Sequence, residues 1–528
     1  MDPAQLAPFQ MHGQDIPSLL AHWADRAPDR AVLTWEPRAG EGRRWTYAEL
    51  LHDTRRLAAG LVARGITPGD KVLIHADNCP EMVLAWLACA TVGAVGVTTN
   101  TRSVAAEVAY FVEKARCVAA ITQPQYAALV SEAAGNMKWV AVTDDNSGEP
   151  PAPGEAGGGH DRFGDLFGDA GDWPGRPVEP MLPYCIMFTS GTTSKPKAVV
   201  HTHANAIWAS RTGPRNIDLG PSDTYLIFLP FFHTNAQTWS FFSVLGAGAG
   251  AVLMPKWSTT RFWDVVARHG VTHTSTMGFL LPMLAAPDKP RTSLRVAVFG
   301  HVLPDLERAS GIGIYAAYGM TETVTHSITA KPVEQLPARS MGHVTPGYEI
   351  AVVDKETGEL CAEGETGELW LRGTRGIQLM LEYFDDPAAN AKAFEDGWFK
   401  TGDMVKMGAG GNVYYQERDK DVLKVGGENV SAKEVEEVAL TVPGVAQVAV
   451  VGKHHEFLDQ VPVAFVIARD GAPGDEELGR QVIAACAQQL ADFKVPRAVY
   501  VVDAFPTGTL DKILKNRLRE MADDHPPV

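Results

Sequence analysis

The first 145 residues of the chain alternate helix-like and strand-like segments. Apolar residues recur at helical spacing over residues 47–64, and the short apolar run at 71–75 is typical of a strand. The pattern repeats as a helix-like segment at 81–92 and a strand-like segment at 94–98. Because short strands that alternate with helices form βαβ units, this order predicts a doubly wound α/β layer with a largely parallel sheet.

The rest of the chain shows a long loop and two further regions. Residues 144–180 are rich in Gly, Pro and Asp and bury little, which predicts a surface loop or linker. The alternation resumes over residues 183–289 and predicts a second α/β layer. Short segments with regular glycine turns over residues 340–403 predict a small antiparallel β unit.

A charged run at residues 417–421 precedes a compact C-terminal segment. Strands are expected there at 445–451 and 461–467, around helices. The sequence therefore predicts two domains, 1–417 and 418–528, of which the second is a small α+β domain.

Composition restricts the class of partner. The chain has 528 residues, 45% of them hydrophobic and 21% charged, which is ordinary for a globular protein. The formal net charge is −16 and no long basic run occurs, so a nucleic acid partner is not expected. An anionic cofactor stays compatible with this charge, because the local field at a binding loop matters there.

Cysteine usage and hydropathy predict the compartment. The six cysteines are scattered without a C-x-x-C pair, which predicts buried small residues and neither disulfides nor a zinc site. No signal-peptide pattern opens the chain, and no apolar run approaches the roughly 18 residues of a membrane span. A cytoplasmic protein without a membrane span is the expectation.

A hydroxyl-rich loop follows the apolar run at residues 184–188, which suits a buried strand. The loop places hydroxyl side chains around one glycine and ends with two lysines: Thr189, Ser190, Gly191, Thr192, Thr193, Ser194, Lys195 and Lys197. Hydroxyl and backbone N–H donors beside two cations suit a polyphosphate. The spacing of a Walker A loop is absent, and a solvated Ser/Thr turn is the alternative for any part of the loop taken alone.

Six further motifs follow in order: Tyr318-Gly-Met-Thr-Glu-Thr323, Gly367-Glu-Leu-Trp-Leu-Arg-Gly373, Trp398-Phe-Lys-Thr-Gly-Asp403, Arg418-Asp-Lys-Asp421, Lys424-Val-Gly-Gly-Glu-Asn-Val430 and Lys512-Ile-Leu-Lys515. With the loop, they resemble the signature motifs of the adenylate-forming superfamily of acyl- and aryl-CoA synthetases, adenylation domains and luciferases. The resemblance extends over residues 30–520. The Phe-His-x-Asn-Ala-Gln pattern at 232–237 is more similar to acyl-CoA ligases of the carnitine/crotonobetaine and fatty-acyl type than to luciferases.

The resemblance implies a fold and a reaction. The fold would be a large N-terminal domain of two doubly wound α/β subdomains with a small antiparallel β unit, followed by a small mobile C-terminal domain that swings about Arg418. The reaction would activate a carboxylic acid with ATP and Mg²⁺ as an acyl-adenylate and then transfer it to CoA. The protein must hold the phosphates, stabilise the charge of in-line transfer and position the acid. The resemblance also allows a homodimer.

The resemblance assigns roles to individual residues. The phosphates would be held by Thr189, Ser190, Gly191, Thr192, Thr193, Lys195 and Lys197. The rest of the nucleotide would be bound by Tyr318 near the adenine, by Thr321, by Asp403 at the ribose hydroxyls and by Arg418. Glu322 would hold Mg²⁺, for which a carboxylate beside phosphate oxygens is suitable. Lys512 would bridge the carboxylate and the α-phosphate, and Gly426, Gly427 and Glu428 would line a narrow channel for the CoA thiol.

The acid site is expected at His233, Asn235, Trp239 and His301, with His233 also counted among the catalytic residues beside Thr189, Glu322 and Lys512. The surrounding phenylalanines favour a largely hydrophobic acid with some polar decoration: Phe231, Phe232, Phe241 and Phe242.

Each of these residues also has a purely structural interpretation. Residues 318–322 could be a capped helix start with Thr321 as N-cap, and Asp403 could be a turn residue. His233 could be a core histidine, Lys512 a surface charge and the two glycines a turn.

Three positions depart from the family pattern. Ala198 and Asp511 stand where glycine is usual, and His301 stands where small residues pass close to the adenine and the acyl group. A Cβ or an imidazole there could crowd the nucleotide, and Asp511 would place a negative charge beside Lys512. Three alternatives therefore stay open: a ligase that only makes the thioester from a preformed acyl-adenylate, an adenylation enzyme that loads a carrier protein or an amine, and a non-catalytic binding protein.

Overall fold

The computed structural model describes residues 6–155, 159–189, 195–418, 422–506 and 513–524. By its internal contacts the chain forms two compact units. The first consists of residues 1–101, 111–187 and 198–417, and the second of residues 102–110, 188–197 and 418–528. The main stretch of the second unit begins at Arg418, where the sequence predicts the start of the C-terminal domain. That this domain swings stays a prediction.

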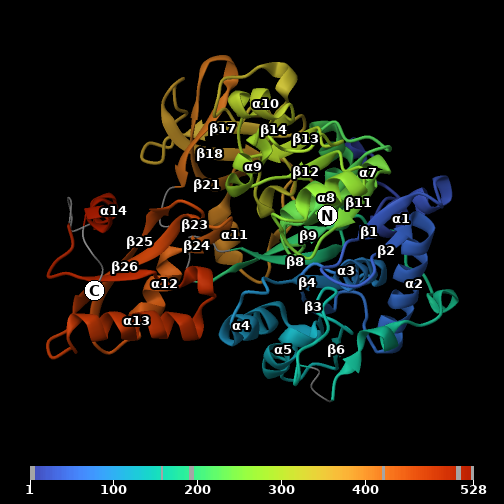
Figure 1. Cartoon of the computed structure of the whole chain (residues 1–528), viewed down its shortest axis with the longest axis horizontal. Coiled ribbons are helices and arrows are strands. Elements are labelled where there is room, and N and C mark those ends of the chain that lie inside the picture. The colour runs from blue at the N-terminus through green and yellow to red at the C-terminus, as the bar shows by residue number, and fades with distance from the viewer. Residues whose placement is uncertain (1–5, 156–158, 190–194, 419–421, 507–512, 525–528) are drawn as a thin grey trace. The chain divides into compact units, whose positions relative to one another are not determined.

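A nine-stranded sheet is the larger sheet among the described residues of the first unit (Figure 1). Its order is β16 (His343–Val344), β15 (Ile328–Ala330), β14 (Gly313–Tyr318), β13 (Val296–Phe299), β12 (His273–Ser275), β10 (Thr224–Ile227), β11 (Gly250–Leu253), β1 (Ala31–Trp35) and β2 (Arg43–Thr46). The strands from β14 to β1 pair in parallel, and antiparallel strands flank them on both sides.

A second sheet shows eight strands in the described part of the chain. Its order is β19 (Glu382–Tyr383), β9 (Lys197–Thr202), β8 (Pro183–Thr189), β4 (Val95–Thr98), β3 (Lys71–His75), β5 (Cys117–Thr122), β6 (Val140–Val142) and β7 (Asp161–Arg162). The pairs from β8 to β7 are parallel, whereas β19 pairs antiparallel with β9. Two largely parallel sheets confirm the predicted α/β class.

The assignment of strands to the two sheets differs from the sequence prediction. The expected layers followed chain order, yet β1 of the N-terminal segment pairs in parallel with β11, as Leu33 opposite Ala251 shows. Conversely, β8 pairs with β4, with Met187 opposite Thr98. Pairing between segments so far apart depends on tertiary packing, which periodicity does not report.

Eleven helices of the described first unit accompany these sheets: α1 (Ile16–Arg26), α2 (Tyr47–Ala63), α3 (Pro80–Val92), α4 (Ala105–Ala115, whose first part belongs to the second unit), α5 (Ala127–Ala133), α6 (His203–Asn216), α7 (Phe242–Ala247), α8 (Phe262–Arg268), α9 (Leu281–Ala285), α10 (Pro304–Ser310) and α11 (Pro387–Ala393). None of the helices that the structure describes is long and apolar enough for a bilayer crossing.

Helix α3 forms the centre of the core because its residues are apolar on every side. Trp86 is fully buried there, and four aromatic rings lie against it: Tyr184, Phe231, Phe241 and Phe242. The preceding helix α2 begins with a capping box in which Thr46 and Glu49 bond each other's backbone N–H. Both helices lie where the sequence predicts them, within one residue at either end.

The segment 144–180 is more than the predicted surface loop. Its short 3-10 helix η4 (Phe163–Leu166) buries Leu166 so closely on α2 that a Cβ at Gly60 would lie 1.5 Å from the Leu166 carbonyl oxygen. Arg176 forms a buried ion pair of 3.0 Å with Asp15, the N-cap of α1. Isolated apolar residues and one arginine anchor this glycine-rich and proline-rich segment, which composition alone does not reveal.

A five-stranded antiparallel sheet completes the first unit, as predicted: β17 (Glu349–Val353), β18 (Thr366–Arg372), β21 (Trp398–Met407) and β20 (Phe394–Glu395), with β22 (Val413–Arg418) on β21. The second unit contains the described strands β24 (Glu428–Ser431), β23 (Val422–Val425), β26 (Asp459–Ala468), β25 (Val445–His455) and β27 (Ala498–Val501). Its C-terminal stretch also contains helices α12 (Ala432–Ala439), α13 (Asp475–Gln489) and α14 (Lys515–Asp524). An α+β composition confirms the class predicted for this part.

Candidate active site

The candidate site of the first unit lies at the carboxyl ends of adjacent strands in the nine-stranded sheet. Strands β10, β12, β13 and β14 pair in parallel in this order, so the loops that follow them emerge at one edge of the sheet. Figure 1 shows β12, β13 and β14 side by side. The loop after β10 leads to His233 and Trp239, the loop after β13 carries His301, and the loop after β14 carries Glu322. Ligands of open α/β sheets bind at such an edge.

Glu322 is held by a tyrosine. It lies in η8 (Thr321–Thr323), a single 3-10 turn, and is 4% exposed. The Tyr383 hydroxyl donates to Glu322 Oε1 at 2.9 Å, and the Glu322 carbonyl accepts the backbone N–H of Met380 at 2.7 Å. Tyr383 therefore orients the carboxylate of Glu322, and Met380 holds its backbone.

Thr321 is not the N-cap that the structural alternative expected, because Met320 takes that position. Instead, the Thr321 carbonyl lies 2.7 Å from Nε2 of His201. Burial lowers the pKa of His201 to about 4, so the ring is neutral and donates its Nε2–H to this carbonyl. His201, which the sequence analysis did not single out, thus orients the turn that carries Glu322.

Asp403 projects from a β-bulge. Thr401, Gly402 and Asp403 of β21 lie opposite the single residue Leu369 of β18. Gly402 has φ +77°, which favours glycine, and this explains the Thr-Gly-Asp sequence. The Tyr318 hydroxyl donates to Asp403 Oδ2 at 2.6 Å, so the nine-stranded and five-stranded sheets meet at two of the predicted nucleotide residues.

The carboxylates of the site supply by themselves only part of the ligands that a magnesium ion needs. The described residues contain no group of three or more His, Cys, Asp or Glu that could hold a metal ion. Mg²⁺ is commonly held by one or two carboxylates together with phosphate oxygens and water. Glu322, buried and oriented by Tyr383, fits such a role.

The backbone after Glu322 is strained. Val324 has φ +65° and ψ −62°, and the Thr325 N–H donates to the Thr323 carbonyl at 2.7 Å. This is a γ-turn of the rare positive-φ type, at a β-branched residue. The Val324 carbonyl accepts from the hydroxyls of Thr234 and Thr238, so the loop after β10 holds the strained turn in place. Strain of this kind, of order 1–3 kcal/mol, is concentrated at functional sites.

Trp239 contacts the same turn. It lies in η6 (Asn235–Phe241), a π-helical segment of a type frequent at functional sites. A Cβ at Gly319 would lie 2.8 Å from Trp239 Cζ2, and the ring centroids of Trp239 and His326 are 4.6 Å apart in an edge-to-face pair. The structure therefore joins a predicted acid-site residue to the second nucleotide motif.

The other predicted acid-site residues lie along the same edge. His233 is half-buried with its ring 4.6 Å from that of Phe232, and Asn235 begins η6. The His301 ring lies 4.9 Å from that of Phe299, at the end of β13. Of the four phenylalanines on which the expectation of a hydrophobic acid rests, Phe231, Phe241 and Phe242 pack on Trp86 in the core.

The described part of the hydroxyl-rich loop belongs to the second unit. Thr189 ends β8 and is half-buried, and Lys197 begins β9. Lys195 is exposed with its ammonium 5.1 Å from the centre of the Tyr110 ring, and the Tyr110 hydroxyl donates to the Pro196 carbonyl at 3.0 Å. Ser190, Gly191, Thr192 and Thr193 lie outside the described residues, as does Lys512.

Gly426 and Gly427 form the two-residue turn of a hairpin between β23 and β24, since Val425 pairs with Glu428. Their φ values are +58° and +90°, as a type I′ turn requires at both positions. The hairpin alone therefore explains why both residues are glycines. That they also line the channel for the CoA thiol stays a prediction. Arg418 ends β22, and its side chain lies outside the described part.

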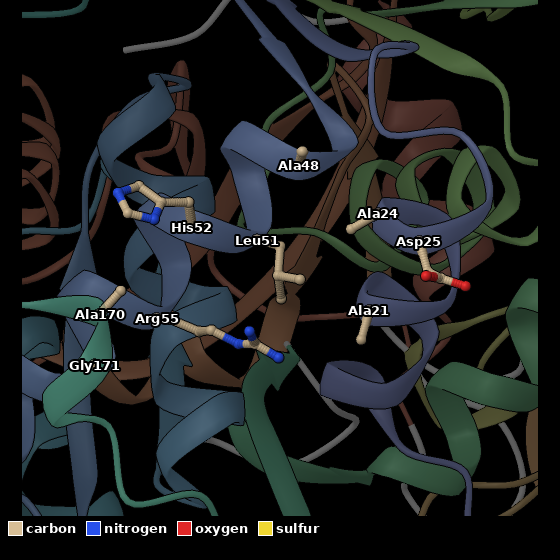
Figure 2. Close-up of a pocket in the computed structure, with 9 residues that line it drawn as sticks. All are labelled: Ala21, Ala24, Asp25, Ala48, Leu51, His52, Arg55, Ala170 and Gly171. Carbon is tan, nitrogen blue, oxygen red and sulfur yellow. The ribbon is translucent and has the colours of Figure 1, made fainter.

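A surface depression of about 580 Å³ lies elsewhere, between α1 and α2. Figure 2 shows Ala21, Ala24 and Asp25 of α1 on one side and His52 and Arg55 of α2 on the other. No residue of the motifs lines this open depression, so we assign it no role in the site.

Several contact residues of the site carry no signal in the sequence analysis, among them His201, Thr325, His326 and Tyr383. Thr325 and His326 lie two and three residues after the motif that ends at Thr323, so its extension could have found them. Tyr383 reaches Glu322 from 61 positions along the chain, and no local signal marks it.

Comparison with known proteins assigns the family. The family described as AMP-binding enzyme matches residues 20–384, and the AMP-binding enzyme C-terminal domain matches residues 434–512. A crotonobetaine/carnitine–CoA ligase from Citrobacter koseri is 31% identical over 523 residues, which cover 96% of this chain and 99% of the relative.

Solved structures agree with this family. The o-succinylbenzoate-CoA synthetase of Bacillus subtilis, a double mutant bound to a product analogue, is 26% identical with a TM-score of 0.80 and covers 96% of this chain and 98% of its own. A fatty acyl-CoA synthetase of Mycobacterium tuberculosis is 28% identical with a TM-score of 0.66 and covers 97% and 98%. The chain therefore belongs to the AMP-binding enzyme family, in the acyl-CoA ligase branch of the adenylate-forming superfamily, and is an ATP-dependent acid–thiol ligase.

Proposed function

We propose that the chain performs both half-reactions on a largely hydrophobic carboxylic acid with some polar decoration, with CoA as the thiol. In the first, a carboxylate oxygen attacks the α-phosphorus of ATP, the bond to the β-phosphate oxygen breaks and pyrophosphate leaves. In the second, the CoA sulfur attacks the acyl carbon and AMP leaves with the electron pair of the broken bond.

The observation that carries this proposal is the pair of buried acidic residues, each oriented by a tyrosine hydroxyl. Glu322, 4% exposed and bonded to Tyr383, would hold Mg²⁺, which would neutralise phosphate charge. Asp403, 6% exposed and bonded to Tyr318, would accept from the ribose hydroxyls. Side chains locked in this way bind a nucleotide without first losing conformational entropy.

The remaining predicted roles are part of the same proposal. Thr189, Lys195 and Lys197, with the undescribed part of their loop, would hold the phosphates, and Lys512 would bridge the acid and the α-phosphate. The Gly426–Gly427 turn would line the thiol channel. The cytoplasmic location and the homodimer stay predictions.

The relatives do not agree on one acid. Their names state crotonobetaine or carnitine, o-succinylbenzoate and fatty acids. In this chain only Phe232 of the four phenylalanines has a ring contact with a predicted acid-site residue, His233, among the contacts described. Trp239, whose ring pairs with that of His326, would supply a second apolar surface of the acid site. We therefore propose a hydrophobic acid of moderate size.

The thioester-only alternative rests on Ala198, His301 and Asp511. Ala198 is 1% exposed within β9, and its carbonyl accepts the Phe384 N–H at 2.8 Å. The Cβ of Ala198 is accommodated within a paired strand, and this favours retention of the adenylation step. Asp511 lies outside the described residues.

A screen of carboxylic acids with ATP and Mg²⁺ tests the proposal. Pyrophosphate release without CoA, followed by AMP release on addition of CoA, is the expected result. AMP release only from a supplied acyl-adenylate would establish the thioester-only ligase instead. AMP release with a carrier protein or an amine but not with CoA would establish the loading enzyme.

A further inference from the structure

Buried polar atoms without a hydrogen-bond partner are concentrated around the loop that follows Glu322. Among the described residues these include Asn235 Oδ1, Trp239 Nε1, Thr325 Oγ1 and both ring nitrogens of His326. His326 itself is 1% exposed and Thr325 is fully buried. Because buried polar groups in folded proteins nearly always have partners, a group of such atoms requires an explanation.

These atoms belong to two segments that the structure holds together. The hydroxyls of Thr234 and Thr238 donate to the Val324 carbonyl, which precedes Thr325 directly. Trp239 lies against Gly319 on one side and meets the His326 ring at 4.6 Å. Asn235 lies four residues before Trp239 in the same π-helical segment. The unpartnered atoms therefore belong to two segments in contact, and their four residues, Asn235, Trp239, Thr325 and His326, are called the polar wall.

The chemistry of this polar wall restricts what it can bind. The indole N–H only donates a hydrogen bond, and an amide oxygen only accepts one. A neutral imidazole donates at one ring nitrogen and accepts at the other. Burial lowers the pKa of His326 to about 3, so the ring carries no charge for a second carboxylate to pair with. A group that both donates and accepts, and has no charge, satisfies such a wall best.

We propose that the acid carries, away from its carboxylate, a neutral hydroxyl or primary carboxamide group, and that His326 is the residue that selects it. This inference rests on the proposed function, since it concerns the acid site of the same reaction. The strained turn at Val324 would then serve to place His326 beside Trp239.

The alternative is that internal water satisfies the wall and that His326 is structural. The two cases differ in specificity. A site built to bond a hydroxyl strongly rejects the analogue that lacks it, because its own polar groups stay unpaired, whereas a water-filled wall has no such preference.

The experiment uses the full-length enzyme with ATP, Mg²⁺ and CoA. The probes are straight-chain acids of increasing length, each as the unsubstituted, the terminal hydroxy and the terminal carboxamide form, and kcat/KM is measured by AMP release. At one chain length the wild type should prefer a polar form by about 100-fold or more. His326→Leu should abolish most of this ratio, and Trp239→Phe, which keeps a ring but removes the N–H, should reduce it.

His75→Leu is the matched control. His75 is also fully buried, has an unpartnered Nε2 and a pKa lowered to about 4, but it ends β3 in the eight-stranded sheet. Its substitution should keep the ratio of the wild type. His326→Asn, which retains a donor and an acceptor, should keep part of the ratio, and His326→Phe replaces the leucine variant if that variant does not fold.

Two results would overturn the inference. One is a wild type that prefers the unsubstituted acid at every length. The other is a preference that survives in His326→Leu, or in His326→Phe if leucine is not tolerated, together with a lowered melting temperature, which would identify a structural histidine. Either leaves the proposed function intact as long as any acid supports AMP release. If no acid does, and a supplied acyl-adenylate is not used either, both are wrong.

Discussion

At the scale of single residues, removal of the tyrosine hydroxyls that orient Glu322 and Asp403 tests the nucleotide site most directly. Tyr383→Phe removes the donor to Glu322 Oε1 and keeps the ring. A carboxylate that loses such an outer partner is held less well, and the typical loss of metal affinity or activity is about 10–100-fold. We expect the Mg²⁺ concentration for half-maximal adenylation to rise by about 10-fold, measured by pyrophosphate release at saturating ATP.

The matched control for this change is Tyr315→Phe. The Tyr315 hydroxyl also bonds a carboxylate, Asp218 Oδ2 at 2.9 Å, but at the protein surface. Its loss should leave the Mg²⁺ dependence unchanged. An equal rise in both variants would show that Tyr383 acts on the fold and not on Glu322.

A Lys512 variant tests whether this lysine acts in adenylation alone or in both half-reactions. Lys512→Ala should abolish acyl-adenylate formation, because the cation that would meet both anions is lost, while thioester formation from a synthetic acyl-adenylate continues. Single-turnover assays of each half-reaction measure this. Lys515→Ala is the control, since Lys515 forms an ion pair with Glu436 at 2.6 Å and should affect stability alone. Equal loss of both half-reactions in Lys512→Ala would contradict the assignment.

At the scale of elements, the hairpin turn at Gly426 and Gly427 carries two interpretations that a pair of variants can separate. Asn tolerates positive φ, so Gly427→Asn keeps the type I′ turn and adds a small side chain, whereas Gly427→Trp adds bulk. If the turn lines the thiol channel, Gly427→Trp should lower thioester formation at least about 10-fold while adenylation continues, and the asparagine variant should be intermediate.

The reading of this result depends on stability. A tryptophan at φ +90° strains the turn by itself, so both variants are compared at equal fractions folded, by melting temperature. Unchanged turnover of CoA in Gly427→Trp would assign the two glycines to the hairpin alone.

The elements also show what the sequence can predict and what it cannot. Strand β3 lies at residues 71–75 and helix α2 begins at Tyr47, as predicted, because apolar periodicity and a capping box are local signals. The π-helical η6, the γ-turn at Val324 and the bulge at Asp403 were not predicted. Each is fixed by contacts between distant segments, such as Thr238 with the Val324 carbonyl, 86 positions away.

The residues of the candidate site also fall into a predicted and an unpredicted group. Family motifs predicted Tyr318, Glu322 and Asp403, and the structure holds all three by hydrogen bonds. The residues that hold or extend them, Tyr383 and His326, carry no motif of their own. Phe231, Phe241 and Phe242, which favoured a hydrophobic acid in the sequence, are fully buried core residues, because spacing along the chain does not report which side of a segment faces a site.

At the scale of the whole molecule, buried histidines should make the first unit sensitive to acid. Burial lowers the pKa of five of them: His75, His201 and His273 to about 4, His326 to about 3, and His203 well below its usual value. All five belong to the first unit. In the unfolded chain the same rings have a pKa of about 6.5.

The sign follows from proton linkage. As pH falls below about 6.5, the unfolded chain binds protons that the folded first unit does not accept until pH approaches about 4. The free energy of unfolding therefore decreases through this window, by up to about 1.4 kcal/mol per pH unit for each histidine, and these groups add no pH dependence above it. Carboxylates with lowered pKa values, such as Glu36 and Asp223, contribute mainly below this range.

Tryptophan fluorescence can measure this effect in the first unit alone, because all twelve tryptophans lie between residues 23 and 398, within its segments. We expect the urea midpoint followed by fluorescence to fall steadily from pH 6.5 to about pH 5, with His75→Asn giving a shallower fall since one titrating group is removed. Far-ultraviolet circular dichroism, which reports both units, should show a smaller shift. A fluorescence midpoint that does not change across this window would mean that the five rings take up protons in the folded chain, and the neutral state assigned to His201 and His326 would then be wrong.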